Sequence, residues 1–154
     1  MRQWRMIPIV LFIAALPLAS SWAGRAVGTW ATEEGKSHVE ITACGKKLCG
    51  NIIRLKEPLD DQGAPKSDAN NPEAALQKRP IIGLPLLVNF SAGTQADVWN
   101  DGTIYNPEDG EIYSCTLTLL DGNTLEVHGY VGLPLFGRTQ IWTRVNLCPA
   151  TGRE

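Results

Sequence analysis

The sequence predicts an all-β protein, folded as an antiparallel up-and-down barrel or a strongly curled meander sheet, with one short helix in a long loop. Two observations support this class. Short segments in which apolar and polar residues alternate follow one another along the chain, as expected of strands with one buried face. Turn signals rich in Gly, Asn, Asp and Pro separate these segments. About nine strands result, and hairpin-linked strands in this number curl or close.

The N-terminus has the pattern of a secretory signal peptide. Arg2 and Arg5 precede an apolar run over residues 7–18, and the sequence Ser21-Trp22-Ala23 has small residues at the −3 and −1 positions of a cleavage site. The run is about a dozen residues long, whereas a transmembrane helix needs about 20. We therefore expect cleavage after Ala23 and no transmembrane anchor afterwards. The predicted organisation is a signal peptide over residues 1–23, one barrel domain over residues 24–148 and a tail over residues 149–154.

The charge of the mature chain argues against some classes of partner. Without Arg2 and Arg5, the 14 basic residues become 12 against 16 acidic ones, which gives a net charge of −4. A surface of this sign repels phosphate backbones and anionic lipids. We therefore expect no nucleic-acid partner and no electrostatic attachment to a membrane.

Three alternating segments open the mature chain. They are predicted strands over residues 27–32, 37–43 and 48–55. A polar turn joins the first two, and a tip flanked by Cys44 and Cys49 joins the second and third. The mature chain is thus predicted to begin with a three-stranded meander.

The four cysteines indicate disulfide bonds, because an even set in an exported chain favours them. Three pairings are possible. A hairpin tip with four loop residues would set Cys44 opposite Cys49, and the same register would pair Ile41 with Ile52. We therefore predict the pairs Cys44–Cys49 and Cys115–Cys148. The spacing differs from that of structural zinc sites, so we expect no metal and no cofactor.

A loop over residues 57–79 interrupts the strands. A loop of this length in a compact domain is unusual, and is often functional or folded on itself. It ends in a predicted short helix over residues 72–78, with Asn71 as N-cap, Pro72 at the first helical position and Pro80 as the stop. The loop lacks the spacing of a calcium-binding EF-hand, so four side chains are read as caps of their own turns: Asp60, Asp61, Asp68 and Asn70.

An apolar five-residue motif occurs twice beside predicted strands. Gly-Leu-Pro-Leu-Leu covers residues 83–87, within strand signals at 81–82 and 86–90, and Gly-Leu-Pro-Leu-Phe covers residues 132–136. Proline cannot donate to a strand ladder, so each copy marks a bend, an edge or a rim. We favour a corner packed on the core, because a barrel needs bends; a pocket mouth is the alternative.

Two hairpins are predicted after the first copy of the motif. Asp101-Gly102 is typical of a two-residue turn and would set Trp99 opposite Ile104. The four-residue turn over residues 107–110 would set Ile104 opposite Tyr113.

A third hairpin turns at residues 121–123, as a two- or a three-residue loop. A two-residue loop would oppose Leu117 to Glu126, whereas a three-residue loop opposes Leu117 to Val127 and Leu119 to Leu125. A slip of one residue turns every side chain to the other face, so we predict the three-residue loop. The last strand covers residues 138–145. This register also opposes Tyr113 to Val131 and places one row of side chains across the strands: Trp99, Ile104, Tyr113 and Val131.

Two resemblances bear on the fold. The tripeptide Gly28-Thr29-Trp30, together with Arg144 on the last strand, resembles the lipocalin or calycin arrangement, in which an arginine of the closing strand packs over a tryptophan near the N-terminus. This resemblance implies that Gly28, Trp30 and Arg144 close the barrel.

Seven segments, spread over the mature chain, resemble the exported bacterial proteins of the domain of unknown function 2147 family. The resemblance implies a lipocalin-like barrel that is periplasmic or secreted in the bacterial envelope, and it supplies no catalytic residue. Cys115 and the tail with Cys148 are additions to the family pattern. The matching segments are GTW at 28–30, CGNI at 49–52, DANNP at 68–72, RPIIGL at 79–84, GTIYNP at 102–107, GYVG at 129–132 and GRTQIWTR at 137–144.

The predicted function is the binding of a small apolar or amphipathic ligand, because a barrel of eight strands has room for one small ligand. A filled barrel that contacts another envelope protein is the alternative, and an exposed apolar patch would mark it. That patch would comprise Leu84, Leu86, Leu133 and Phe136. The candidate ligand-binding residues are Trp99, Tyr105, Tyr113, Leu117, Val127 and Tyr130, with Arg138 or Arg144 as an anion partner.

An enzyme is not predicted. His38 and His128 lie on faces that alternate away from the apolar rows, and no nucleophile motif is present in the sequence. Tyr105, Arg138 and the carboxylates at 108–109 could act as acids or bases, but a tight turn explains those two carboxylates without chemistry.

Overall fold

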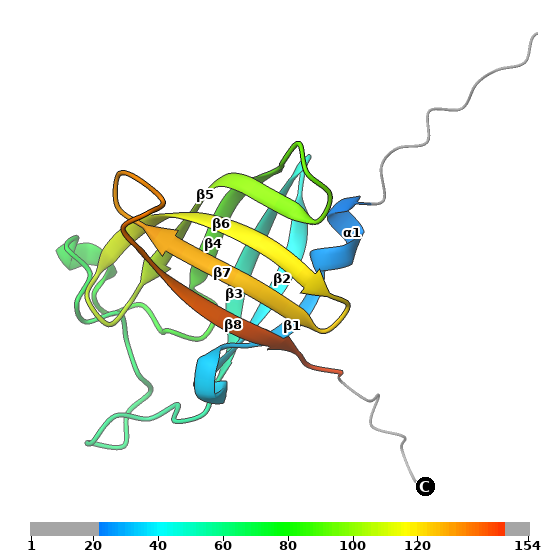
Figure 1. The fold of residues 1–154 in the computed structure, drawn as a ribbon. Coiled ribbons are helices and arrows are strands. Elements are labelled where there is room, and N and C mark those ends of the chain that lie inside the picture. The colour runs from blue at the N-terminus through cyan, green and yellow to red at the C-terminus, as the bar shows by residue number, and fades with distance from the viewer. Residues whose placement is uncertain (1–21, 147–154) are drawn as a thin grey trace, which may run out of the picture.

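The chain folds as a closed barrel of eight antiparallel strands, in which each strand pairs with the next and the last returns to the first (Figure 1). The structure is a computed structural model, and it describes residues 22–146. The prediction of an all-β, up-and-down barrel is confirmed. The predicted signal peptide lies outside the described residues except at its end, as do the tail and Cys148.

The strands follow one another with two short 3₁₀ helices between them. Ile81-Ile82 lies outside any strand, and residues 98–106 form one strand rather than two, so there are fewer strands than the nine expected. The predicted helix at 72–78 is a single 3₁₀ turn, Ala74–Leu76. The elements are α1 (Trp22–Ala26), β1 (Gly28–Ala31), η1 (Glu33–Gly35), β2 (Ser37–Cys44), β3 (Lys47–Leu55), η2 (Ala74–Leu76), β4 (Pro85–Ala92), β5 (Val98–Asn106), β6 (Glu111–Asp121), β7 (Thr124–Tyr130) and β8 (Gly137–Arg144).

The predicted turn at Asp101-Gly102 is wrong, because the two residues form an irregularity inside β5. The register between β5 and β6 shifts between Trp99 and Gly102, and Asp101 has a φ of 60°. The ring of Phe90 from β4 covers Gly102, where an added Cβ would lie 2.4 Å from ring atoms. A neighbouring strand therefore decides this geometry, and Trp99 lies opposite Leu117 rather than Ile104.

The other two hairpins of this region have the predicted registers. Ile104 lies opposite Tyr113, and Leu117 lies opposite Val127. The predicted three-residue loop is wrong, because Asp121 lies opposite Thr124, and a register shift between Leu119 and Asp121 gives the predicted pairs instead. The predicted opposition of Tyr113 and Val131 is wrong, because β7 ends at Tyr130 and the chain leaves the sheet there. Of the four residues predicted to form one cross-strand row, only Ile104 and Tyr113 lie opposite each other.

The disulfide between Cys44 and Cys49 is present, with 5.8 Å between the two Cα atoms. Its predicted register is wrong. Cys49 lies opposite Thr42, two residues before Cys44, and Val39 rather than Ile41 lies opposite Ile52. Gly45 has a φ of 68°, which allows a tighter turn than the four-residue loop expected.

One end of the barrel, beside α1 (Figure 1), is closed by Arg144, the last residue of β8, which binds the Arg25 carbonyl of α1. Its guanidinium lies 4.2 Å from the centre of the Trp30 ring and donates to the carbonyl oxygens of Arg25, Val27 and Gly122. Gly28, at a φ of 136°, leaves the space for it, because an added Cβ would lie 2.6 Å from Arg144. These contacts join the first strand, the last strand and the β6–β7 turn.

Large apolar side chains pack in the half of the barrel that Arg144 closes. Three tryptophans are among them, and each is at most 1% exposed. The largest fully buried side chains of the described residues include Trp30, Trp99, Trp142, Phe90, Leu87 and Leu117.

Cys115 faces this core from β6, and burial raises the pKa of its thiol to about 12. Because the thiolate is the reactive form, iodoacetamide should leave Cys115 unmodified in the native protein near pH 8, as read by mass spectrometry. Rapid native labelling would contradict the buried position. No disulfide partner lies within residues 22–146, so denaturation tests the predicted bond to Cys148. A bonded Cys115 stays unlabelled until reductant is added.

Candidate ligand cavity

A cavity of about 510 Å³ opens at the end of the barrel opposite α1. This volume lies within the usual range of small-molecule sites, about 300–1,000 Å³. Residues of η1, the β5–β6 turn and the β7–β8 loop form its mouth, and inward-facing strand residues form its walls. The barrel is therefore packed at one end and hollow at the other.

Apolar side chains line the inner walls. They come from alternate positions of the strands, where every second residue faces inward, and from the segment before β4. Trp142 of β8, at 1% exposed, forms part of the inner surface. The apolar lining comprises Ile52, Leu55, Ile81, Leu86, Ile104, Val127 and Trp142.

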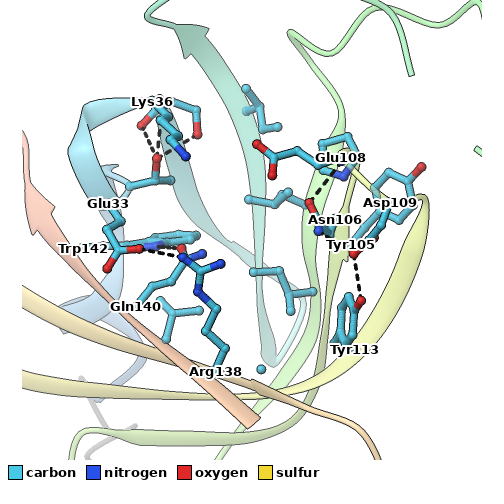
Figure 2. A pocket seen from close by; sticks show the side chains of 18 of the residues that line it. Glu33, Lys36, Tyr105, Asn106, Glu108, Asp109, Tyr113, Arg138, Gln140 and Trp142 are labelled. Carbon is cyan, nitrogen blue, oxygen red and sulfur yellow. Dashed lines mark hydrogen bonds and ion pairs between the residues drawn. The ribbon is translucent and has the colours of Figure 1, made fainter. Parts of the chain in front are cut away.

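Charged side chains stand on both sides of the mouth (Figure 2). Glu33 and Lys36 extend from the η1 turn, and Arg138 of β8 binds Glu33 at 3.2 Å between Nη2 and Oε2. Glu108 and Asp109 stand on the opposite side, in the β5–β6 turn. The mouth thus carries both signs of charge around an apolar interior.

Most polar groups near the inner walls are already hydrogen-bonded. The Tyr113 hydroxyl donates to Asp109 Oδ2 at 2.8 Å. Burial alone would raise the pKa of Asp109, but the backbone N–H of Glu111 and the Tyr113 hydroxyl lower it below its ordinary value. The Trp142 indole N–H donates to Gln140 Oε1 at 2.9 Å. Within the described residues, no acceptor is found for Gln140 Nε2, so this amide can donate to a ligand.

A buried carboxylate lies behind the wall residue Tyr105. The Tyr105 hydroxyl donates to Asp68 Oδ1 at 2.6 Å, and Asn71 and Arg79 donate to Asp68 Oδ2 at 2.8 Å. Burial alone would raise the pKa of Asp68, but these hydrogen bonds and the Arg79 charge lower it. Burial and the Asp68 carboxylate raise the pKa of Tyr105. This polar cluster ties the 57–79 loop to β5.

The same loop also fixes the β5–β6 turn at the mouth. Asn70 Nδ2 donates to the carbonyl oxygens of Pro107 and Glu108 at 3.2 and 3.0 Å. Gly110, at a φ of 76°, allows the close approach of the Asn70 carbonyl. Asp60 accepts from two backbone N–H groups of its own turn, as expected of a cap. Residues 22–146 hold no cluster of His, Cys, Asp or Glu placed to bind a metal.

The structure brings five of the predicted ligand-binding residues to the cavity: Tyr105, Tyr113, Val127, Tyr130 and Arg138. Trp99 and Leu117 face inward but lie in the packed half, because alternation gives the face of a strand and not the depth along the barrel. Arg144 lies at the closed end, so only Arg138 can meet a ligand in the cavity.

Several cavity residues were missed by sequence reasoning. Gln140 and Trp142 alternate on the inner face of the predicted last strand, and that alternation could have identified them. In the sequence, Glu33 and Lys36 have the pattern of an ordinary polar turn, and only closure of the barrel brings them to the mouth. The histidines stay outside: His128 binds Thr139 and the Pro134 carbonyl on the outer face.

The two copies of the apolar motif have different environments. The first forms a corner packed on the core, as predicted, with Leu84 and Leu86 buried. The second is the β7–β8 loop, where Leu133 and Phe136 are exposed. The predicted apolar patch is therefore reduced to the second copy, which lies at the cavity mouth.

A closed eight-stranded barrel with one packed end and one open cavity is a lipocalin-like barrel. A solved structure, Protein HP1028 from Helicobacter pylori, described as belonging to the lipocalin family, matches with a TM-score of 0.67 and 24% sequence identity, over 79% of this chain and 83% of that chain. The chain belongs to the bacterial family described as domain of unknown function 2147, whose pattern matches residues 28–144. No functionally curated protein matches. Among residues 22–146, no helix has the length and hydrophobicity needed to span a bilayer.

Proposed function

We propose that this chain is a non-catalytic binding protein that holds one small amphipathic ligand in the barrel cavity. The observation that carries the proposal is a cavity of about 510 Å³ with apolar walls and charged groups at its mouth. An apolar interior favours the apolar part of a ligand because burial removes that surface from water. A few polar groups at fixed positions then orient the ligand.

The arrangement of the lining indicates how the ligand lies. Its apolar part enters between Ile104, Val127 and Trp142, and its polar part stays at the mouth near Lys36 and Arg138. Gln140 provides a donor between the two regions. The mouth carries both signs of charge, so it accepts a polar or zwitterionic head group better than a group of high charge.

The hydrogen bonds of the cavity support binding rather than catalysis. A tyrosine is an effective general base only as the phenolate. Burial and the Asp68 carboxylate raise the pKa of Tyr105, and the Asp109 carboxylate raises that of Tyr113, so both hydroxyl groups stay protonated and donate to these carboxylates. These pairs make the wall rigid. Membership of a bacterial family and the Cys44–Cys49 disulfide support a location outside the cytoplasm.

Gly129→Phe tests the cavity directly. Gly129 lines the cavity at a φ that is not positive, and an added Cβ would lie 3.5 Å from Ile104 and 3.8 Å from Tyr113, which are ordinary contacts. The phenyl ring should fill the cavity and weaken binding of the neutral probe N-phenyl-1-naphthylamine by at least about tenfold, as read by fluorescence titration.

Ile112→Phe is the matched control, because Ile112 is exposed on β6 and does not line the cavity. It should bind the probe like the parent chain, and both variants should keep the parent melting temperature. The full chain should also be expressed with its own N-terminal segment, so that the cell exports and processes it. Native mass spectrometry of this protein should show a chain that begins at Gly24, with a ligand mass that is lost on denaturation. Equal probe binding by Gly129→Phe, or no binding by the parent, would contradict the proposal.

A further inference from the structure

We propose that the β7–β8 loop, residues 131–136, docks the mouth of the barrel onto a lipid bilayer by inserting its apolar side chains. Four large apolar residues of this loop are exposed: Val131 by 67%, Leu133 by 64%, Leu135 by 85% and Phe136 by 70%. Figure 1 shows the loop, in orange, at the open end of the barrel. So dense an exposed apolar segment marks an interaction site.

Hydrogen bonds connect the loop to the strands at its base. His128 Nε2 donates to the Pro134 carbonyl at 2.7 Å, since a carbonyl can only accept, and Nδ1 binds Thr139 Oγ1 at 2.8 Å. The Phe136 N–H donates to the Leu133 carbonyl at 3.0 Å. An added Cβ at Gly137 would lie 2.7 Å from the His128 ring. The base of the loop is therefore closely packed.

These hydrogen bonds favour a bilayer as the partner. Hydrocarbon offers no polar partners, so an inserted segment must satisfy its backbone groups internally. The loop meets this demand in part: the carbonyls of Leu133 and Pro134 and the Phe136 N–H are bonded, and Pro134 has no N–H. The side chains also stand out from the rim, and a protein partner would need a matching hollow, whereas a bilayer needs none.

The charges around the loop indicate an uncharged lipid surface. Residues 131–136 carry no charged side chain, and the adjacent Arg138 is paired with Glu33. The acidic mature chain repels anionic lipid. Attachment therefore depends on burial of apolar surface, which is worth about 25 cal/mol per Å².

The loop is continuous with the cavity. Val131 and Phe136 line the mouth as well as being exposed, so one apolar surface extends from the loop tip into the barrel. A ligand with an apolar body could enter from the bilayer without crossing water. This entry route rests on the proposed function, whereas docking itself does not.

Flotation with phosphatidylcholine vesicles tests the docking. The double variant Leu133→Glu/Leu135→Glu should lower the vesicle-bound fraction at least about tenfold, because two charged groups replace the inserted side chains. Neither residue lines the cavity, so binding of N-phenyl-1-naphthylamine should not change. The control is Leu120→Glu, an exposed leucine at the closed end of β6, which should float like the parent. All three chains share one N-terminus, so their differences report the loop.

The outcomes separate this proposal from its rivals. No flotation of the parent, or equal flotation of the double variant, would overturn docking. Binding that needs phosphatidylglycerol and disappears in salt would also overturn it, because attachment would then be electrostatic. A parent that does not float but is a dimer, made monomeric by the double variant, would assign the loop to a contact between copies. Flotation without probe binding would support docking and contradict the proposed ligand function.

Discussion

Asp68→Ala should lower the free energy of unfolding by about 3 kcal/mol, because it removes the acceptor shared by three buried or half-buried donors. The Asp68 side chain is fully buried, and Tyr105, Asn71 and Arg79 all donate to it. Arg79 is partly exposed and can turn toward water, whereas Tyr105 and Asn71 are left without this partner. Denaturant unfolding measures the change.

Asp68→Asn is the matched control, because it keeps the volume and one acceptor oxygen while removing the charge. It should lose less stability than the alanine variant. The ionised carboxylate stabilises the fold, because hydrogen bonds hold its pKa below the ordinary value of 3.8. Stability from this group is therefore full above pH 3.8 and is lost as the pH falls through the lower pKa of the folded state. The asparagine variant should lack this acid-dependent component, and an identical acid profile would contradict the assignment.

Arg144→Ala should lower the free energy of unfolding by about 3 kcal/mol as well. The alanine loses the contact with Trp30 and leaves the carbonyl oxygens of Val27, Arg25 and Gly122 without their charged donor. Hydrogen bonds to charged groups contribute about 1.5–3 kcal/mol each, and partial exposure reduces the sum. Burial also lowers the pKa of Arg144, although an arginine stays protonated.

Arg144→Lys distinguishes the contribution of the positive charge from that of the planar arrangement of guanidinium donors. An ammonium keeps the positive charge but cannot reach three carbonyls of separate segments in one plane. Lysine should therefore recover less than half of the lost stability in the same unfolding experiment. Full recovery would show that charge alone closes the barrel. Probe binding at the distant cavity should be unchanged in both variants.

The parts of the fold that could be predicted are those fixed by neighbours in the sequence. The turns at 107–110 and 121–123 have the predicted registers because local turn residues and adjacent strands determine them. The same kind of signal failed at Asp101-Gly102, where the Phe90 ring from another strand covers the glycine. Local chemistry could not reveal that contact.

The candidate site was predicted in part, for a similar reason. Alternation placed Val127 and Trp99 on the inner face alike, but only the closed barrel shows that one lines the cavity and the other is packed. The cluster around Asp68 was invisible in the sequence, since Asp68 and Tyr105 are 37 positions apart and the 57–79 loop that carries Asp68 has no periodicity. Long-range contacts decide both features.

The exposure of the β7–β8 loop has a consequence for how this protein can evolve. Every residue from 131 to 136 is exposed, so substitutions there remove little buried surface and cost little folding stability. The closing contacts of Arg144 lie at the far end and do not depend on this loop. Selection can therefore alter the mouth by single substitutions or short insertions while the barrel stays as it is. New surfaces can arise here without stabilising mutations having to come first.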